Sequence, residues 1–197
     1  MMSRAFSLST NKMMLELSLN VLDIVNNSIR ANATLITIAI GIHKNADILS
    51  ITIADNGCGM TGEQLTRVSD PFYTTRTTRG VGLGIPFFRQ AALDTGGSFS
   101  ITSEPRAGTT IHAEFGLSHI DRMPLGNINS TIHTLIIANK QIDFLYTYEF
   151  DGRKFHLDTR EFRKILGDIP MDLPEVSNYI KEYLEENQRE VDEGYPI

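Results

Sequence analysis

The chain has 197 residues with 41% hydrophobic and 21% charged side chains, a globular composition that excludes disordered and fibrous folds. Its longest apolar stretches, such as residues 35–42, fall far short of the roughly 20 residues needed to span a bilayer. The single cysteine, Cys58, cannot form an internal disulfide, and residues 1–12 lack the apolar core of a signal peptide. The sequence therefore predicts a cytoplasmic protein with no membrane partner.

The net charge of −6 is concentrated at the end of the chain. Residues 1–169 carry 16 acidic and 16 basic side chains, whereas residues 170–197 carry 8 acidic side chains against Lys181 and Arg189. A solvated acidic helix face is the simplest interpretation of this end. Because acidic surfaces repel nucleic acid, and because no basic run with interleaved aromatic residues occurs elsewhere, the sequence predicts no nucleic-acid partner.

The hydrophobic pattern changes its period along the first part of the chain. A Ser/Thr-rich lead-in over residues 1–13 precedes residues 15–31, where apolar side chains recur every three or four positions, as in a helix with one buried face. Segments that alternate and are rich in Ile and Thr then predict strands, and Thr61 with Gln64 forms a capping box that begins a short helix. The predicted strands are 34–42, 48–54, 98–103 and 109–115, and another helix is predicted over 85–94.

Helices and strands in this order predict an α/β layered domain over residues 14–118. Pro124 and Gly126 then indicate a linker over residues 119–129. Residues 130–197 predict a small C-terminal α+β segment of unknown role that ends in the acidic helix. Within it, strands are predicted over 131–138, 142–150 and 153–157, followed by two helices.

Four polar residues of the first predicted helix lie on one stripe because they stand three, four and three positions apart: Asn20, Asp23, Asn27 and Arg30. Many amphipathic helices show such a face to water, and this interpretation is the simpler one. In the functional alternative, an amide and a carboxylate one turn apart hold a hydrated magnesium ion, which takes few protein ligands.

The segment Asp55 to Met60 follows an apolar strand. Its Asp-Asn-Gly sequence could turn a hairpin, but the residues beyond it predict a helix and therefore no returning strand. A carboxylate at a strand end can accept a hydrogen bond from an exocyclic amine, and nearby glycines let a flat ring approach the backbone. Adenine is such a ring.

A glycine-rich segment, Arg79 to Gly84, precedes the helix predicted over 85–94. Its small residues leave backbone amides free at a helix start, where the amides and the helix dipole favour a phosphate. The segment matches neither the dinucleotide fingerprint nor the Walker loop. Arg76 and Arg79 could pair with phosphate oxygens, while a solvated loop is the alternative interpretation.

Together these segments resemble the GHKL ATP-binding domains of gyrase, heat-shock chaperones, sensor histidine kinases and mismatch-repair MutL proteins. The motifs occur in family order as LDIVNNS at 22–28, DNGCG at 55–59, DPFYTTR at 70–76 with a glycine box at 80–84, and GTT at 108–110. The resemblance implies a two-layer α/β sandwich with a mixed sheet, the Bergerat fold of histidine kinase-like ATPases. It also implies ATP and Mg²⁺ as cofactors.

The resemblance assigns roles to individual residues. Asn27 falls on the magnesium-binding asparagine, Asp55 on the adenine-reading carboxylate, and Thr109 on the threonine that assists adenine recognition. Asp23 stands where ATP-hydrolysing relatives carry a glutamate and many histidine kinases an asparagine, so it is a candidate general base. The other nucleotide-binding residues that the resemblance implies are Gly57, Gly59, Met60, Arg76, Arg79, Gly80, Gly82, Leu83 and Gly84.

The resemblance implies a regulatory protein that hydrolyses ATP slowly or transfers its γ-phosphate to a protein partner, as histidine kinases and anti-sigma kinases do. No helical hairpin with a phosphoacceptor histidine precedes the ATP-binding residues, so we expect no conventional autokinase in this chain. The alternative is a non-enzymatic module, in which ATP closes residues 73–79 over the site and changes the docking of the C-terminal segment on a partner. Some members of this family dimerise, so the resemblance also allows a homodimer.

Overall fold

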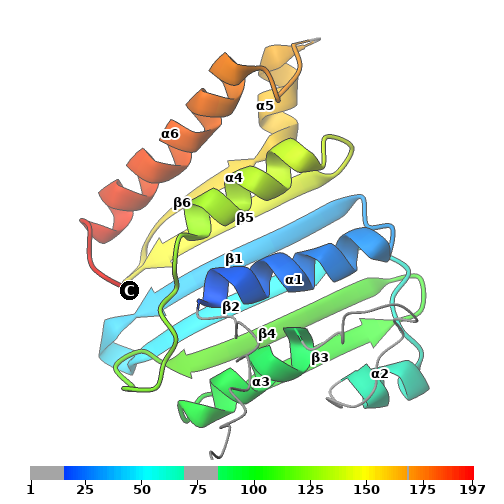
Figure 1. Ribbon diagram of the computed structural model, residues 1–197, viewed down its shortest axis with the longest axis vertical. Coiled ribbons are helices and arrows are strands. Elements are labelled where there is room, and N and C mark those ends of the chain that lie inside the picture. Colours follow the sequence, from blue (N-terminus) through cyan, green and yellow to red (C-terminus); the bar gives the residue numbers. More distant parts are fainter. Residues whose placement is uncertain (1–15, 69–83, 168) are drawn as a thin grey trace, which may run out of the picture.

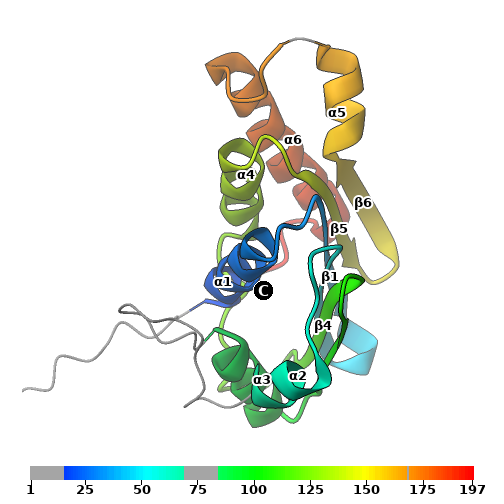
Figure 2. The same cartoon turned by 90° about the vertical axis from the view of Figure 1, so that its right-hand side faces the viewer.

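Figure 1 shows a computed structural model of the chain, which describes residues 16–68, 84–167 and 169–197. Six strands form one mixed sheet in the order β3-β4-β2-β1-β5-β6. Figure 2 shows helices α1, α3 and α4 on the same side of this sheet. The elements are α1 (Leu17–Arg30), β1 (Leu35–His43), the short 3-10 helix η1 (Lys44–Ala46), β2 (Ile48–Asp55), α2 (Gly62–Val68), α3 (Gly84–Asp94), β3 (Phe99–Glu104), β4 (Gly108–Gly116), α4 (Ile128–Ala138), β5 (Asp143–Phe150), β6 (Arg153–Asp158), α5 (Thr159–Leu166) and α6 (Pro174–Asp192).

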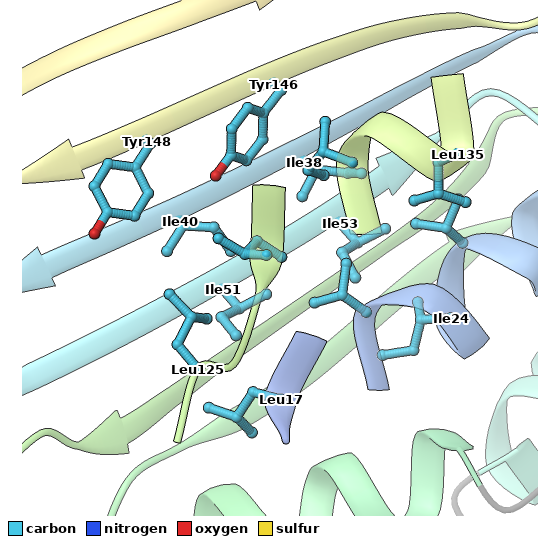
Figure 3. Close-up of a cluster of buried hydrophobic side chains, with 14 of the residues drawn as sticks. Leu17, Ile24, Ile38, Ile40, Ile51, Ile53, Leu125, Leu135, Tyr146 and Tyr148 are labelled. Atoms are coloured by element: carbon cyan, nitrogen blue, oxygen red, sulfur yellow. The ribbon is translucent and has the colours of Figure 1, made fainter. Parts of the chain in front are cut away.

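The first part of the chain confirms the predicted helix and strand order. The apolar stripe of α1 buries Leu17, Val21 and Ile24 against the sheet. The isoleucines of β1 all lie on the core face of the sheet, and the residues between them lie on the opposite face. Figure 3 shows Ile38 and Ile40 of β1 with Ile51 and Ile53 of β2 pointing into this core. The capping box is confirmed at the start of α2, where Thr61 N–H donates to Gln64 Oε1 at 2.8 Å and Gln64 N–H donates to Thr61 Oγ1 at 3.3 Å.

The strand predicted over residues 131–138 is wrong, because these residues lie in helix α4. The Asn127 side chain accepts a hydrogen bond from Ser130 N–H at 2.9 Å and so caps the N-terminus of this helix. Ile128, Ile132 and Leu135 are buried at helical spacing. The run of β-branched residues favoured a strand locally, but the cap and the buried stripe outweigh that propensity.

The sheet continues beyond the residues that carry the motifs. Strand β5 pairs in parallel with β1 from Leu35↔Asp143 to Ile42↔Phe150, and β6 pairs antiparallel with β5. The two strands and two helices predicted after residue 140 are confirmed as β5, β6, α5 and α6. The inner side chains of β5, including Tyr146 and Tyr148 in Figure 3, belong to the same core cluster as β1 and α1.

The segment predicted as a linker is bonded to the first helix. Leu17 N–H donates to Pro124 O at 3.0 Å, and Ser18 N–H donates to Leu125 O at 2.9 Å. These bonds satisfy two of the N–H groups that a helix N-terminus leaves unpaired. The boundary at residue 118 stays a prediction, and both the sheet and this backbone pairing cross it.

Across the described part of the chain, no helix combines the length and the apolar character needed to cross a membrane.

Candidate nucleotide site

The carboxylate of Asp55 is held at the end of β2 by two hydrogen bonds. Ser28 Oγ donates to Asp55 Oδ2 at 2.6 Å, and Gly57 N–H donates to Asp55 Oδ1 at 2.9 Å. Each oxygen therefore accepts one bond and keeps a lone pair for a ligand. Sequence reasoning missed Ser28, which is buried in α1 one position after Asn27. Its place at the end of the LDIVNNS motif, directly after a predicted ligand, was the available signal.

The turn after Asp55 joins the ends of two strands and leads into α2. Asn56 Oδ1 accepts hydrogen bonds from Thr34 N–H at 2.8 Å and Leu35 N–H at 2.9 Å, which ties this turn to the start of β1. The chain then enters α2 at Gly62. The hairpin interpretation of residues 55–57 is therefore wrong, and the turn instead aims Gly57 N–H at Asp55.

The segment Gly57 to Met60 meets the start of β4. Thr109 pairs in register with Asp55 across the β2–β4 ladder, and Thr109 Oγ1 lies 2.9 Å from Ser103 Oγ. Met60 N–H donates to the same Ser103 oxygen at 2.9 Å. Gly59 lies against the backbone carbonyls of Glu104 and Gly108. The structure thus brings together the predicted residues Asp55, Gly57, Gly59, Met60 and Thr109.

The polar stripe of α1 faces the start of α3. A Cβ placed on Gly84, the first residue of α3, would lie 1.9 Å from Asp23 Oδ2, so the two residues are in contact. Asn27, one turn further along, is half-buried and its Oδ1 accepts a hydrogen bond from Arg30 Nη1 at 3.4 Å. Asn20 on the same stripe is 0% exposed, and neither of its amide atoms has a hydrogen-bond partner among the described residues. The stripe is therefore not simply a face shown to water.

Part of the predicted site lies outside the described residues. This part comprises the segment 73–79, which is expected to cover the nucleotide, and the residues Arg76, Arg79, Gly80, Gly82 and Leu83. The placed site consists of two regions, one around Asp55 and Thr109, and one formed by Asp23, Asn27 and Gly84. Ser28 follows Asn27 in α1 and bonds Asp55, so it connects the two regions.

The residues in place fit a hydrated magnesium ion held mainly by nucleotide phosphates. Asn27, which lies one turn after Asp23 on the same stripe, offers a half-buried amide oxygen. Magnesium keeps most of its waters and takes one or two protein oxygens, so this donor set is sufficient. Within the described ranges, no group of three or more His, Cys, Asp or Glu side chains could enclose a metal ion.

Residues 15–119 match the family of histidine kinase-, DNA gyrase B- and HSP90-like ATPases. The match covers more than half of the chain, and the chain belongs to this family. Domains of this family bind ATP, and the described sheet and helices have its α/β architecture. The resemblance drawn from the sequence motifs is confirmed.

Similar proteins include several bacterial sensor kinases. A putative sensor protein of Shewanella frigidimarina is 34% identical over 105 residues, 51% of this chain and 16% of that protein. The sensor protein kinase FleS of Pseudomonas aeruginosa is 38% identical over 58 residues, 29% of this chain and 14% of that protein. The histidine protein kinase DivJ of Caulobacter vibrioides is 32% identical over 95 residues, 46% of this chain and 16% of that protein. The matched part spans less than a fifth of each of these relatives.

A solved structure shares the fold over most of this chain. It is the N-terminal domain of a DNA repair protein, with a TM-score of 0.55 and 19% sequence identity. The match covers 80% of this chain and 59% of that domain. At this identity the likeness concerns the fold alone.

Proposed function

We propose that the chain binds Mg-ATP between α1, the start of α3 and the adjoining ends of β2 and β4. The observation that carries this proposal is the Asp55 carboxylate, which Ser28 and Gly57 hold with a free lone pair on each oxygen. Such a group accepts a hydrogen bond from the exocyclic amine of adenine. Thr109 assists from the neighbouring strand, and Gly57, Gly59 and Met60 line the approach to the ring.

At the other end of the site, the protein would hold the phosphates and their metal ion. Asn27 would bind the magnesium ion, and Gly84 begins a helix whose N-terminal amides and dipole favour a phosphate. The proposed residues of the covering segment and glycine box are Arg76, Arg79, Gly80, Gly82 and Leu83. Bound Mg-ATP would supply a phosphoryl group for transfer.

We further propose that Asp23 acts as the general base of slow ATP hydrolysis. Its carboxylate lies beside Gly84, at the end of the site where the terminal phosphate would be bound. From there Asp23 would accept the proton of an attacking water, which a positioned carboxylate does within hydrogen-bond reach. In transfer to a protein partner, a side chain of that partner would replace the water. The sensor kinases among the relatives support such a partner.

The test measures nucleotide binding, phosphate release and protein labelling with γ-labelled Mg-ATP, using wild type, Asp55→Asn, Asp23→Asn and the control Asp94→Asn. Asp94 is an exposed acid at the end of α3. We expect Asp55→Asn to lose nucleotide binding. The asparagine amide group would present an N–H donor, as well as an acceptor, to the exocyclic amine of adenine. Asp23→Asn should keep ATP affinity and lose phosphate release, whereas Asp94→Asn should behave as wild type.

Each other outcome has a definite meaning. A wild-type protein that binds no ATP would refute the proposed site. Binding without release or labelling would support the alternative, an ATP-gated module that changes the docking of a partner. Unchanged release in Asp23→Asn would remove the role assigned to Asp23 and leave the binding site intact.

A further inference from the structure

Ser103 lies at the centre of a hydrogen-bonded cluster that the sequence analysis did not include. Its half-buried side chain comes from β3 and contacts the turn after β2 and the start of β4. Ser103 Oγ lies 2.8 Å from Gly108 O, 2.9 Å from Thr109 Oγ1 and 2.9 Å from Met60 N. Three bonds are as many as one serine hydroxyl can make, because it carries one proton and two lone pairs.

The chemistry of the three partners fixes the direction of each bond. The Gly108 carbonyl can only accept a hydrogen bond, so Ser103 donates its single hydroxyl proton to that bond. The Met60 amide can only donate, and it occupies one Ser103 lone pair. The remaining bond therefore has Thr109 as the donor. With its proton committed to Ser103, the Thr109 hydroxyl can meet a ligand only as an acceptor.

Ser103, Thr109 and Asp55 form one row across three neighbouring strands. Thr109 pairs in register with Asp55 on one side and with Ser103 on the other. Residues directly opposite in antiparallel strands place their side chains on the same face, with Cβ atoms about 4.5–5.5 Å apart. The Asp55 carboxylate and the Thr109 hydroxyl are therefore neighbouring acceptors on the face of the sheet that carries the site.

We propose that Ser103 is a positioning residue that sets the base preference of this site for a 6-aminopurine. This inference rests on the proposed nucleotide binding and adds the device that selects the base. The exocyclic amine of adenine donates two hydrogens and suits two neighbouring acceptors. Guanine places a carbonyl oxygen at the same ring position, and this acceptor would face Asp55 and a Thr109 hydroxyl that cannot donate to it.

Ser103→Ala tests the proposal because it frees the Thr109 proton without changing Thr109 or Asp55. The full-length protein is titrated with the magnesium complexes of ATP, GTP and purine riboside triphosphate, which lacks the amine. We expect Ser103→Ala to bind ATP about tenfold more weakly, the size of one hydrogen bond, and to bind the amine-free nucleotide as wild type does. Its preference for ATP over GTP should fall.

Ser103→Thr and Ser100→Ala are the matched controls. Ser103→Thr keeps the hydroxyl and should restore the wild-type preference. Ser100 lies on the same strand with its exposed side chain on the opposite face, so Ser100→Ala should leave all three affinities unchanged. Thr109→Val is the second variant, and it should lose the same amine-dependent affinity without a further loss when combined with Ser103→Ala.

Three results would count against the inference, and they are distinguishable. Equal weakening of all three nucleotides in Ser103→Ala would mean that Ser103 only supports the local structure, and it would overturn the inference while the proposed function stands. Additive losses in the double variant would do the same. Failure of the wild-type protein to bind any of the three nucleotides would overturn the proposed function and this inference with it.

Discussion

Asp23 in α1 and Gly84 at the start of α3 are in direct contact, so a Cβ at position 84 would lie 1.9 Å from Asp23 Oδ2. The positive end of a helix dipole stabilises a carboxylate placed near it. The two helices therefore meet through a glycine and an acid at the point where the proposed site would hold phosphate. One substitution, Gly84→Ala, can separate the role of this contact in activity from its role in folding.

Gly84→Ala should reduce ATP turnover more than stability. The added methyl group collides with the end of the Asp23 side chain, which can rotate away but then loses its position for proton transfer. Because a positioned general base contributes about 100-fold or more, we expect turnover to fall at least tenfold. Steady-state phosphate release and thermal unfolding would be measured side by side. Gly62→Ala is the control because no atom of the described residues lies within 4 Å of a Cβ there. Normal turnover in Gly84→Ala would contradict the role of the contact.

Gly108→Ala should destabilise the protein through its backbone. Gly108 has a φ of +98°, and a Cβ there would lie 1.8 Å from the carbonyl oxygen of Asp55, which cannot rotate away. Gly152 has a similar φ of +87°, but in the described part of the chain no atom lies within 4 Å of an added Cβ. Both alanine variants bear the cost of about 1–3 kcal/mol for a left-handed backbone. Urea unfolding should show a clearly larger loss for Gly108→Ala, and equal losses would show that β4 shifts freely.

Alkaline pH should unfold the protein through two tyrosines of β5. Burial raises the pKa of Tyr146 and Tyr148, and the nearby Asp192 raises both further. Both hydroxyls thus stay protonated in the folded protein, whereas in the unfolded chain they lose protons above about pH 10. The unfolded state then binds fewer protons, so stability falls as pH rises, by up to about 1.4 kcal/mol per pH unit for each tyrosine.

Urea unfolding between pH 8 and pH 11 measures this slope. Tyr146→Phe should remove the share of one tyrosine, because phenylalanine fills the same buried space without a titrating group. Tyr179→Phe is the control, because it removes a phenol hydroxyl from a side chain that is 58% exposed. An identical slope in wild type and Tyr146→Phe would contradict the assignment.

A chain that ends at residue 118 should fail to fold cooperatively. It would lack β5, whose eight register pairs cover the edge of β1, and the Pro124 and Leu125 carbonyls that cap α1. Burial of one large apolar side chain contributes about 1.5–3 kcal/mol, and β5 buries Phe144, Tyr146, Tyr148 and Phe150. This sum rivals the whole stability of a domain, about 5–15 kcal/mol. Circular dichroism and a urea melt decide the result. A cooperative transition with retained ATP binding would instead establish residues 119–197 as a separate module.

The sequence by itself determined the elements that local patterns encode. The three- and four-residue spacing of apolar side chains defined α1, the alternation of Ile and Thr defined β1 and β2, and Thr61 with Gln64 marked the start of α2. The ordered motifs around Asn27 and Asp55 led to the family that residues 15–119 match. These features depend on residues close together in the chain, so they can be predicted from the sequence without knowledge of the tertiary structure.

Only the tertiary structure decided which distant residues meet. The local pattern of the Ile-rich segment 131–138 predicts a strand, but the Asn127 cap and the packing of Ile132 stabilise a helix. Ser103 lies in no motif, and Ser28 lies in one that assigns it no role. Both serines matter because α1 and β3 bring them to Asp55 and Thr109. The parallel pairing of β5 with β1 joins segments far apart in the chain, and no local pattern encodes such a partner.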